Sequence, residues 1–222
     1  MNMTTETVSG PGVKPVLAYY YKDGLYLNIT NRCPTACSFC VKRTWQWRYR
    51  GWNLKLNGDP PVLRILEEAR VAAAAKPVKE LVFCGYGEPT YRLDVIRAVG
   101  AEMALEFPGL RRRLNTIGLG NAIWKRSIVP DLKDRIEAVS VSLNTADPEE
   151  WRRIMRPAAA YRDGFKDVLS FVRECVAAGI ETRVTAIEGI GSDAEAVRVL
   201  AKSLGANYLL RANLEEEEQK GE

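Results

Sequence analysis

Segments with apolar residues at every second position alternate along the chain with segments in which they recur every three to four residues. The first pattern predicts strands and the second predicts amphipathic helices. The predicted strands are residues 25–30, 80–84, 112–116, 138–143, 181–187 and 206–210. The predicted helices are residues 61–75, 90–106, 122–128, 148–155, 164–178 and 193–204. Repeated strand–helix units predict a parallel sheet with right-handed crossovers.

Local signals support several of these boundaries. Asp147 followed by Pro148 gives an N-cap and a proline at the first helical position. Ser192 with Glu195 three residues later has the form of a capping box. An Asp-Gly turn within residues 21–25 predicts a small hairpin ahead of the first strand.

Several predicted strands carry polar side chains on one face only. In the first, apolar residues alternate with Tyr26, Asn28 and Thr30, and in the fifth Arg183 and Thr185 share a face. Central strands of a doubly wound sheet are apolar on both faces, whereas a polar inner face suits an incomplete barrel with a ligand in its lumen. Six strands are too few for a closed eight-stranded barrel. We therefore predict an α/β fold, an open partial (β/α)6 TIM-type barrel with a parallel sheet and functional groups at the C-terminal strand ends.

The length of 222 residues suits a single core domain. We predict a flexible N-terminal lead over residues 1–17, a core domain over 18–211 and an acidic, flexible tail over 212–222. No stretch approaches the roughly 20 apolar residues that span a bilayer. The first residues lack the basic and apolar regions of a signal peptide. We expect a cytoplasmic protein.

Composition narrows the chemistry. The net charge of +4 does not by itself indicate nucleic-acid binding. The chain has no histidine, which excludes histidine-ligated zinc and Ser-His or Cys-His catalysis. It has five cysteines, and three of them lie within eight residues. A disulfide framework is not expected in a cytosolic chain, so the clustered thiols suggest metal.

Cys33, Cys37 and Cys40 follow the first strand with CxxxCxxC spacing. Three thiolates on one loop can hold a small cluster, and a cubane of four irons then keeps one iron open for a chelating ligand. The alternative is structural zinc, whose sites are nearly always filled by four ligands. Cys84, at the end of the second strand, is the candidate for that fourth ligand.

This spacing, with Phe39 just before the third cysteine, resembles the signature of the radical SAM superfamily. The resemblance implies a [4Fe–4S] cluster whose open iron chelates the amino and carboxylate groups of S-adenosyl-L-methionine (SAM). It implies reductive cleavage of SAM to a 5′-deoxyadenosyl radical that abstracts hydrogen from a substrate. It also implies that Phe39 packs near the adenine and that an external donor such as ferredoxin or flavodoxin supplies the electron.

The turn after the second strand, Cys84-Gly85-Tyr86-Gly87-Glu88-Pro89, resembles the GGEP motif of that family, with Tyr86 in place of a glycine. The resemblance implies that Gly85, Gly87 and Glu88 bind the amino group of SAM. Without a ligand, the same residues would form a tight turn with a solvated glutamate.

Three further strand ends carry candidates for the same cofactor. The segment after the third strand resembles the TNG-type loop, with Ile117 in place of the usual asparagine and with Asn115 and Thr116 as the candidates. By resemblance, Ser142 and Asn144 bind the ribose hydroxyls or the methionine carboxylate, and Arg183 lies where the family contacts carboxylate. The alternative is that these side chains only satisfy a polar lumen.

Longer stretches resemble the small radical SAM proteins associated with TatD-family hydrolases, namely LYLNITNRCPTACSFC, FCGYGEPT and VSVSLNTADPEEWRRIMRP. This resemblance implies no settled substrate. We therefore expect a radical SAM enzyme that acts on an unidentified substrate, a small molecule, a nucleic acid or a protein. The alternative function is a non-catalytic zinc or iron–sulfur module that binds a nucleic-acid or protein partner.

The loop 41–58 carries Trp45, Trp47 and Trp52 together with Lys42, Arg43, Arg48 and Arg50. We interpret it as a lid that excludes water from a reactive centre, and the alternative is an anchor for a nucleotide-like substrate. We interpret Arg111–Arg113 as a solvated strand entry and Cys175 as a core residue. For Cys84, packing is preferred to a role as a hydrogen-atom donor.

Overall fold

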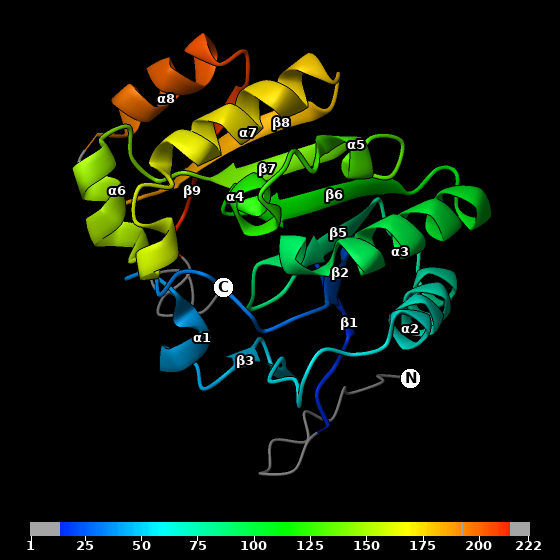
Figure 1. The fold of residues 1–222 in the computed structure, drawn as a ribbon. Helices are drawn as coiled ribbons and strands as arrows, with labels where there is room; N and C mark the ends of the chain where they lie inside the picture. The colour runs from blue at the N-terminus through cyan, green and yellow to red at the C-terminus, as the bar shows by residue number, and fades with distance from the viewer. Residues whose placement is uncertain (1–13, 192, 214–222) are drawn as a thin grey trace.

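The computed structural model describes residues 14–191 and 193–213. Among them, seven strands form one sheet in the order β1-β2-β5-β6-β7-β8-β9 (Figure 1). Strands β2 to β9 of this sheet run parallel, and β1 pairs antiparallel with β2 at one edge. The strands are β1 Ala18–Tyr21, β2 Gly24–Asn28, β5 Glu80–Cys84, β6 Arg111–Thr116, β7 Ala138–Ser142, β8 Glu181–Ile187 and β9 Asn207–Arg211. This arrangement confirms the predicted open partial barrel.

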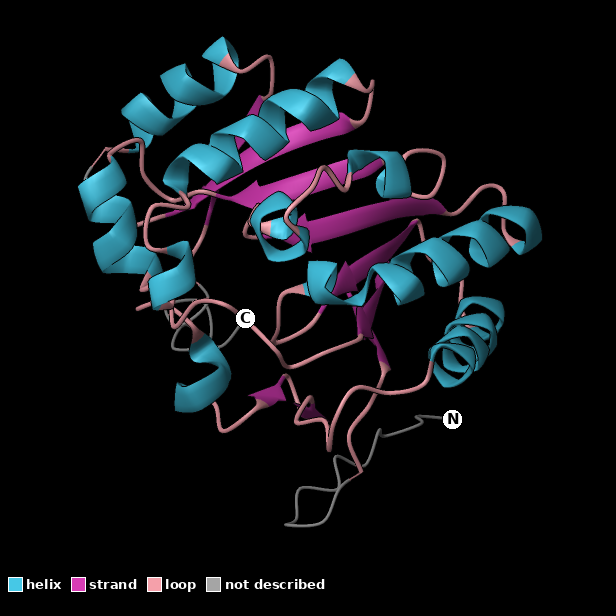
Figure 2. Ribbon diagram, viewed as in Figure 1, coloured by secondary structure: helices cyan, strands magenta, loops and turns pink. Residues whose placement is uncertain are grey.

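Most of the larger helices lie against one face of this sheet, namely α2 Val62–Ala75, α3 Leu93–Glu106, α7 Phe165–Ala177 and α8 Ala194–Ser203 (Figure 2). Helix α6 Pro148–Met155 lies beyond the strand ends, at the left of the view. Shorter elements are α1 Val41–Thr44, α4 Gly120–Trp124, α5 Val129–Leu132, and the 3-10 helices η1 Pro89–Arg92 and η2 Ala159–Tyr161. A separate two-stranded sheet pairs β3 Arg48–Tyr49 with β4 Trp52–Asn53.

The hydrophobic core lies between the sheet and these helices. The strands contribute side chains from alternate positions, such as Leu27, Leu114 and Val141, and the helices contribute Trp151 and Phe171, all fully buried. Each such side chain stabilises the fold by about 1.5–3 kcal/mol. The opposite face of the sheet is polar, as the alternation predicts, and is left free to surround a cavity.

Most element boundaries match their predictions. Strands β5 and β8 and helix α6 coincide with the predicted ranges, and the predicted hairpin is the β1–β2 pair. Residues 89–92 form a 3-10 turn in place of the first turn of the predicted helix. Helix α5 and the β3–β4 pair were not predicted from the sequence.

Two predictions at the chain ends fall partly outside the described residues. Most of the lead over residues 1–17 and of the tail over 212–222 lies there, but Leu17 is buried in the core, so the packed chain begins before residue 18. Ser192 also lies outside the described residues. The N-cap of α8 is Asp193, whose carboxylate accepts a hydrogen bond from the Ala196 amide at 2.9 Å.

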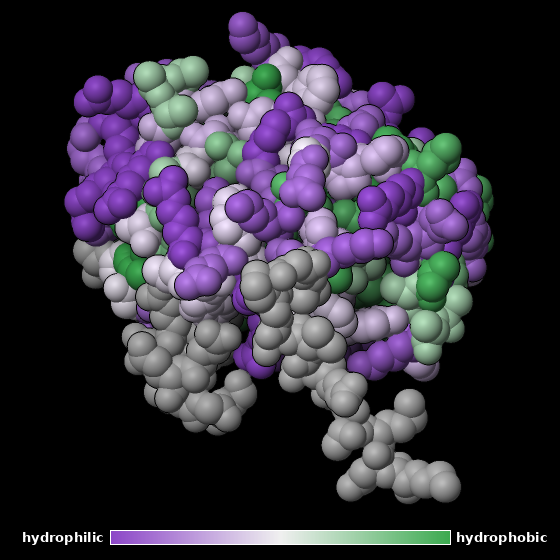
Figure 3. Space-filling view, turned by 90° about the horizontal axis from the view of Figure 1, so that it is seen from below, coloured by the Kyte–Doolittle hydropathy of each residue, from purple (hydrophilic) through white to green (hydrophobic). Residues whose placement is uncertain are grey.

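The surface is mainly hydrophilic. On the face that Figure 3 shows, apolar residues gather mainly toward the right-hand side. The most exposed large apolar side chains are Leu63 and Val71 on α2 and Leu105 on α3. No helix in the described part of the chain is long and apolar enough to cross a membrane.

Candidate functional site

The cysteine loop leaves β2 and is fixed against the C-terminal end of α6. The Ala36 amide donates to the Arg156 carbonyl at 3.0 Å, and the Ser38 amide donates to the Ile154 carbonyl at 2.8 Å. An isolated β-bridge between residues 35 and 157 adds a further link. Backbone hydrogen bonds therefore hold the loop in place by themselves.

The loop gathers its three half-buried thiols on one turn. The Thr35 hydroxyl lies 3.3 Å from both Cys33 Sγ and Cys37 Sγ. Cys37 Sγ is also 3.9 Å from Met155 Sδ on α6. Cys40 is the N-cap of α1, and its amide donates to the Cys37 carbonyl at 3.1 Å. The Cys33 and Cys37 thiols thus lie on the two sides of the Thr35 hydroxyl near the end of α6, and Cys40 follows them on the same short segment.

The surroundings of Cys33 and Cys37 favour the neutral form of both thiols. Burial raises the pKa of Cys33 and raises that of Cys37 to about 12, while the Thr35 hydroxyl opposes the shift in both. Metals bind the thiolate, so binding must displace these protons.

The thiols are not arranged around one atom. Within residues 14–191 and 193–213, no three His, Cys, Asp or Glu side chains are grouped so as to hold a single metal ion. A zinc ion draws its ligands to about 2.0–2.3 Å of one centre. A cubane presents separate irons to separate thiolates. Cys84, the fourth ligand in the zinc alternative, lies instead on the sheet, where the Asn115 amide is 3.6 Å from its sulfur.

The glycines of the turn after β5 allow it to pack closely against β2 and the cysteine loop. Gly85 has φ +110°, and a Cβ there would collide with the Asn28 side chain. A Cβ on Gly87 would collide with the carbonyl oxygens of Thr30 and Arg32. Only glycine fits these two positions without a backbone shift. The turn and the cysteine loop are therefore in direct contact.

Glu88 connects this turn to the end of β6. The residue is 1% exposed. Its carboxylate accepts hydrogen bonds from the Thr90 amide (3.1 Å), the Thr90 hydroxyl (2.7 Å), the Thr116 hydroxyl (2.6 Å) and the Ile117 amide (2.8 Å). Burial raises its pKa, and these hydrogen bonds oppose the shift. The interpretation of Glu88 as a solvated side chain is therefore wrong, and most of its hydrogen-bonding capacity is used within the protein.

A cavity of about 550 Å³ lies between the polar face of the sheet and the segment 41–58. Its volume is within the usual range for small-molecule sites. Six residues expected from the sequence line it, namely Gly85, Gly87, Glu88, Asn115, Ser142 and Arg183. Phe39 is not among the lining residues and packs against the hydrophobic core.

Asn144 lies behind the cysteine loop, outside the lining of the cavity. It is 1% exposed and has φ +70°. Its amide nitrogen is 3.3 Å from Ser142 Oγ and 3.4 Å from Sδ of Met155, the residue that also contacts Cys37. Its oxygen is buried without a hydrogen-bond partner among the described residues. A buried acceptor without a partner suits a ligand that brings an N–H or O–H group.

The interpretation of residues 111–113 as solvated is wrong for Arg113. Its side chain is 11% exposed and lines the cavity. Arg113 Nε and Nη2 donate to Glu80 Oε2 at 3.0 and 2.8 Å, and Arg113 Nη1 donates to Asn115 Oδ1. Arg112 points to the other face and is 7% exposed, paired with Glu137. The sequence pattern already indicated that Arg113 faces the cavity, because Arg113 and Asn115 are two residues apart on one strand and so share a face.

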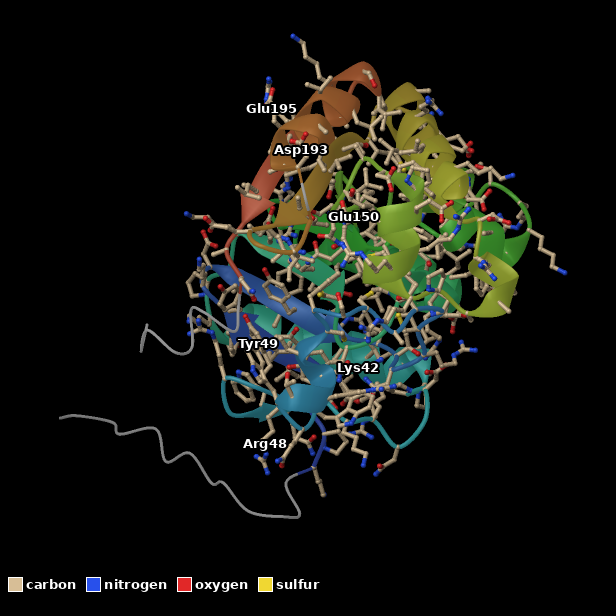
Figure 4. The ribbon with its side chains drawn as sticks, turned by 90° about the vertical axis from the view of Figure 1, so that its left-hand side faces the viewer. Lys42, Arg48, Tyr49, Glu150, Asp193 and Glu195 are labelled. Carbon is tan, nitrogen blue, oxygen red and sulfur yellow. The ribbon has the colours of Figure 1, made fainter. Side chains whose placement is uncertain are left out.

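The segment 41–58 covers one side of the cavity, to which it contributes Val41, Tyr49 and Leu54. The Tyr86 hydroxyl donates to the Arg48 carbonyl at 2.5 Å and ties the segment to the glycine turn. Figure 4 shows Lys42, Arg48 and Tyr49 together on this segment, apart from the acidic residues labelled on α6 and at the start of α8. This placement suits the lid interpretation and leaves the anchor interpretation open to test.

Comparisons with known proteins agree with this geometry. The model of the Radical SAM superfamily matches residues 27–202. A GTP 3′,8-cyclase from Rhodopseudomonas palustris (strain TIE-1) is 28% identical over 187 residues, which cover 81% of this chain and 48% of the relative. The chain thus spans about half the length of the first curated relatives it matches.

Solved structures share the fold. SuiB of Streptococcus suis, bound to the precursor peptide SuiA, gives a TM-score of 0.65 at 16% identity, over 87% of this chain and 40% of that one. The radical S-adenosylmethionine methyltransferase TsrM of Kitasatospora setae, with cobalamin and a [4Fe–4S] cluster bound, gives 0.54 at 17% identity, over 85% and 34%. Because the family model covers most of its length, this chain belongs to the radical SAM superfamily, whose enzymes use a [4Fe–4S] cluster and S-adenosylmethionine.

Proposed function

We propose that Cys33, Cys37 and Cys40 ligate the [4Fe–4S] cluster. The observation that carries the proposal is their grouping on a single loop, which α6 and the glycine turn hold in place without metal. Three thiols and the lack of histidine in the chain suit a cluster that keeps one iron free of protein ligands. When bound and reduced, the cluster supplies the electron that cleaves SAM to methionine and a 5′-deoxyadenosyl radical, which abstracts hydrogen from the substrate.

The residues around the cavity have separate tasks in binding SAM. Gly85 and Gly87 bring the backbone of the turn close to the ligand, and Glu88 holds that turn against β6. This assigns Glu88 a positioning role, in place of the direct contact with the ammonium group that the motif implies. Outside the lining of the cavity, the buried Asn144 oxygen has no hydrogen-bond partner among the described residues, and we assign it to an N–H or O–H group of the ligand.

The remaining cofactor contacts come from the polar face of the sheet and from the cysteine loop. Asn115 and Ser142 present amide and hydroxyl groups to the cavity, and Arg183 presents a cation for the carboxylate of SAM. Phe39, within the cysteine loop, packs against the core, so its role toward the adenine depends on a contact made only when SAM is bound.

Several curated relatives are named GTP 3′,8-cyclase and another is named a probable RNA methyltransferase, so a nucleotide is the first class of substrate to test. The motifs shared with the TatD-associated group support a place in that group and imply no substrate. Enzymes of the superfamily need an external electron donor, and we propose a ferredoxin or flavodoxin for this one.

Anaerobic reconstitution with iron and sulfide tests the proposal. The expected result is a brown protein that forms 5′-deoxyadenosine from SAM under dithionite. Cys33→Ser, Cys37→Ser and Cys40→Ser should each abolish both colour and product, while Cys175→Ser, in the core, serves as the matched control. A colourless protein that holds one tightly bound zinc would overturn the proposal.

A further inference from the structure

Two arginines on the polar face of the sheet lack an anionic partner. Arg183 Nε donates to Ser140 Oγ at 3.3 Å, and Arg211 Nη2 donates to Ser142 Oγ at 3.2 Å. Both arginines line the cavity. Over the described ranges, neither forms an ion pair with any carboxylate. Serine hydroxyls do not neutralise a guanidinium, so among the described residues neither arginine has an anion in direct contact.

Burial makes that arrangement costly. Arg211 Nε is buried and has no hydrogen-bond partner in the described part of the chain. Burial lowers the pKa of both arginines, and Arg183 further lowers the pKa of Arg211. Because unpaired buried cations are unfavourable, such a pair is typical of a site that an anionic ligand completes.

The carboxylates near the cavity are already engaged. Glu80 accepts hydrogen bonds from Arg113, and its other oxygen lies 3.8 Å from Arg111. The carboxylate of Glu88 accepts hydrogen bonds from residues of its own turn and of β6. Among residues 14–191 and 193–213, no carboxylate is placed to neutralise the two arginines, which suits an anion that comes with a ligand.

SAM has only one carboxylate, and we propose that the cluster iron and Arg183 bind it. Arg211 pairs with Ile187, two residue pairs further along the sheet than Thr185, at the C-terminal end of β9, and its guanidinium reaches across to Ser142 on β7. Arg183 and Arg211 hydrogen-bond to different serines, Ser140 and Ser142, so each guanidinium can bind an anion of its own. With the carboxylate of SAM assigned to Arg183, Arg211 is left for a second anion.

The edge of the sheet opposite these arginines is aromatic. Four tyrosines that line the cavity contact one another in a closed ring of pairs, at centroid distances from 5.5 to 5.9 Å. They are Tyr19, Tyr21, Tyr26 and Tyr49. Three belong to β1 and β2, whereas Arg183 and Arg211 belong to β8 and β9 at the other edge. Aromatic faces of this kind favour a planar or apolar ligand group.

We propose that Arg211 binds an oxyanion, a phosphate or a carboxylate, of a small-molecule substrate whose remaining part packs against the four tyrosines. The inference rests on the proposed function, because it takes the cavity as the place where SAM and substrate meet. The guanidinium fork matches both oxyanions in a bidentate manner. Arg211 thus distinguishes the substrate, and Arg183 holds the carboxylate of SAM.

The test uses the reconstituted protein with inorganic phosphate and acetate as probes, and calorimetry measures their binding with and without SAM. We expect saturable binding of at least one probe in the presence of SAM, weakened about tenfold or more in Arg211→Gln, as expected for loss of a charged hydrogen bond. Arg64→Gln, which removes an exposed cation on α2, should bind like the unmodified protein. Arg211→Lys keeps the charge without the fork and should fall between the two.

The formation of 5′-deoxyadenosine from SAM, measured without substrate, shows whether Arg211 binds the carboxylate of SAM or the oxyanion of a second ligand. Arg211→Gln should change the KM for SAM less than twofold, while Arg183→Gln should raise it. The inference is overturned if SAM displaces the probe completely, if Arg211→Gln weakens SAM binding as much as probe binding, or if probe binding is the same in Arg211→Gln. Failure of the unmodified, brown protein to form 5′-deoxyadenosine would instead count against the proposed function.

Discussion

Removal of the Glu88 carboxylate should destabilise the protein far more than its position in a surface turn motif suggests. In Glu88→Ala, the backbone amides of Thr90 and Ile117 lose their acceptor in the folded state. At about 1–3 kcal/mol for each buried donor left without a partner, the expected loss is about 2–6 kcal/mol. Such a loss is a large fraction of the roughly 5–15 kcal/mol that keeps a domain folded.

Glu88→Gln provides a graded comparison. The glutamine oxygen can still accept from Thr90 and Thr116, but its amide group would face the Ile117 N–H, so one hydrogen bond is lost. We expect a loss of about 1–3 kcal/mol.

Urea unfolding of the metal-free protein, followed by circular dichroism under anaerobic conditions, measures both values. Glu68→Ala removes an exposed carboxylate that pairs with Arg64 at 3.2 Å, and should cost less than about 1 kcal/mol. A Glu88→Ala protein within about 0.5 kcal/mol of the unmodified one would refute the reasoning, because that is the scatter of ordinary surface substitutions.

Three further outcomes follow from the same site. Gly87→Ala should destabilise the metal-free protein by about 1–3 kcal/mol and lower the iron content after reconstitution, because its Cβ meets two backbone carbonyls; unchanged unfolding and iron content would contradict this. Asn144→Ala should raise the KM for SAM in 5′-deoxyadenosine formation, since it removes a buried acceptor without a partner; an unchanged KM would count against that contact. Removal of iron with a chelator should bleach the protein without loss of its far-ultraviolet circular dichroism, because backbone hydrogen bonds to α6 hold the cysteine loop; unfolding on bleaching would show that the metal holds the loop.

Local patterns in the sequence were sufficient for the fold. The boundaries of α6 were predictable because Asp147 and Pro148 mark its start, and the structure has the Asp147 carboxylate accepting from the Glu150 amide at 2.6 Å. The two faces of the sheet were predictable from alternation alone. The grouping of the three cysteines also follows from their short spacing.

The rest of the site depends on contacts between distant parts of the chain. The burial of Glu88 arises from Thr116 and Ile117, 28 and 29 residues away, and no local pattern predicts that pairing. Arg113 was interpreted as solvated because arginine is usually exposed, but its strand turns it inward toward Glu80. The tyrosine ring includes Tyr49, which joins through the unpredicted β3–β4 pair.

The alternation of the strands has a consequence for how the protein tolerates change. On β6, Leu114 belongs to the core while its neighbours Arg113 and Asn115 line the cavity. Substitution of Arg113 or Asn115 should therefore mainly change ligand affinity, whereas substitution of Leu114 should mainly lower resistance to unfolding. A single-residue deletion within β6 would exchange the two roles, and place a guanidinium in the core and a leucine in the cavity. The register of each strand, which decides the face that every side chain occupies, therefore matters more here than the identity of any one side chain.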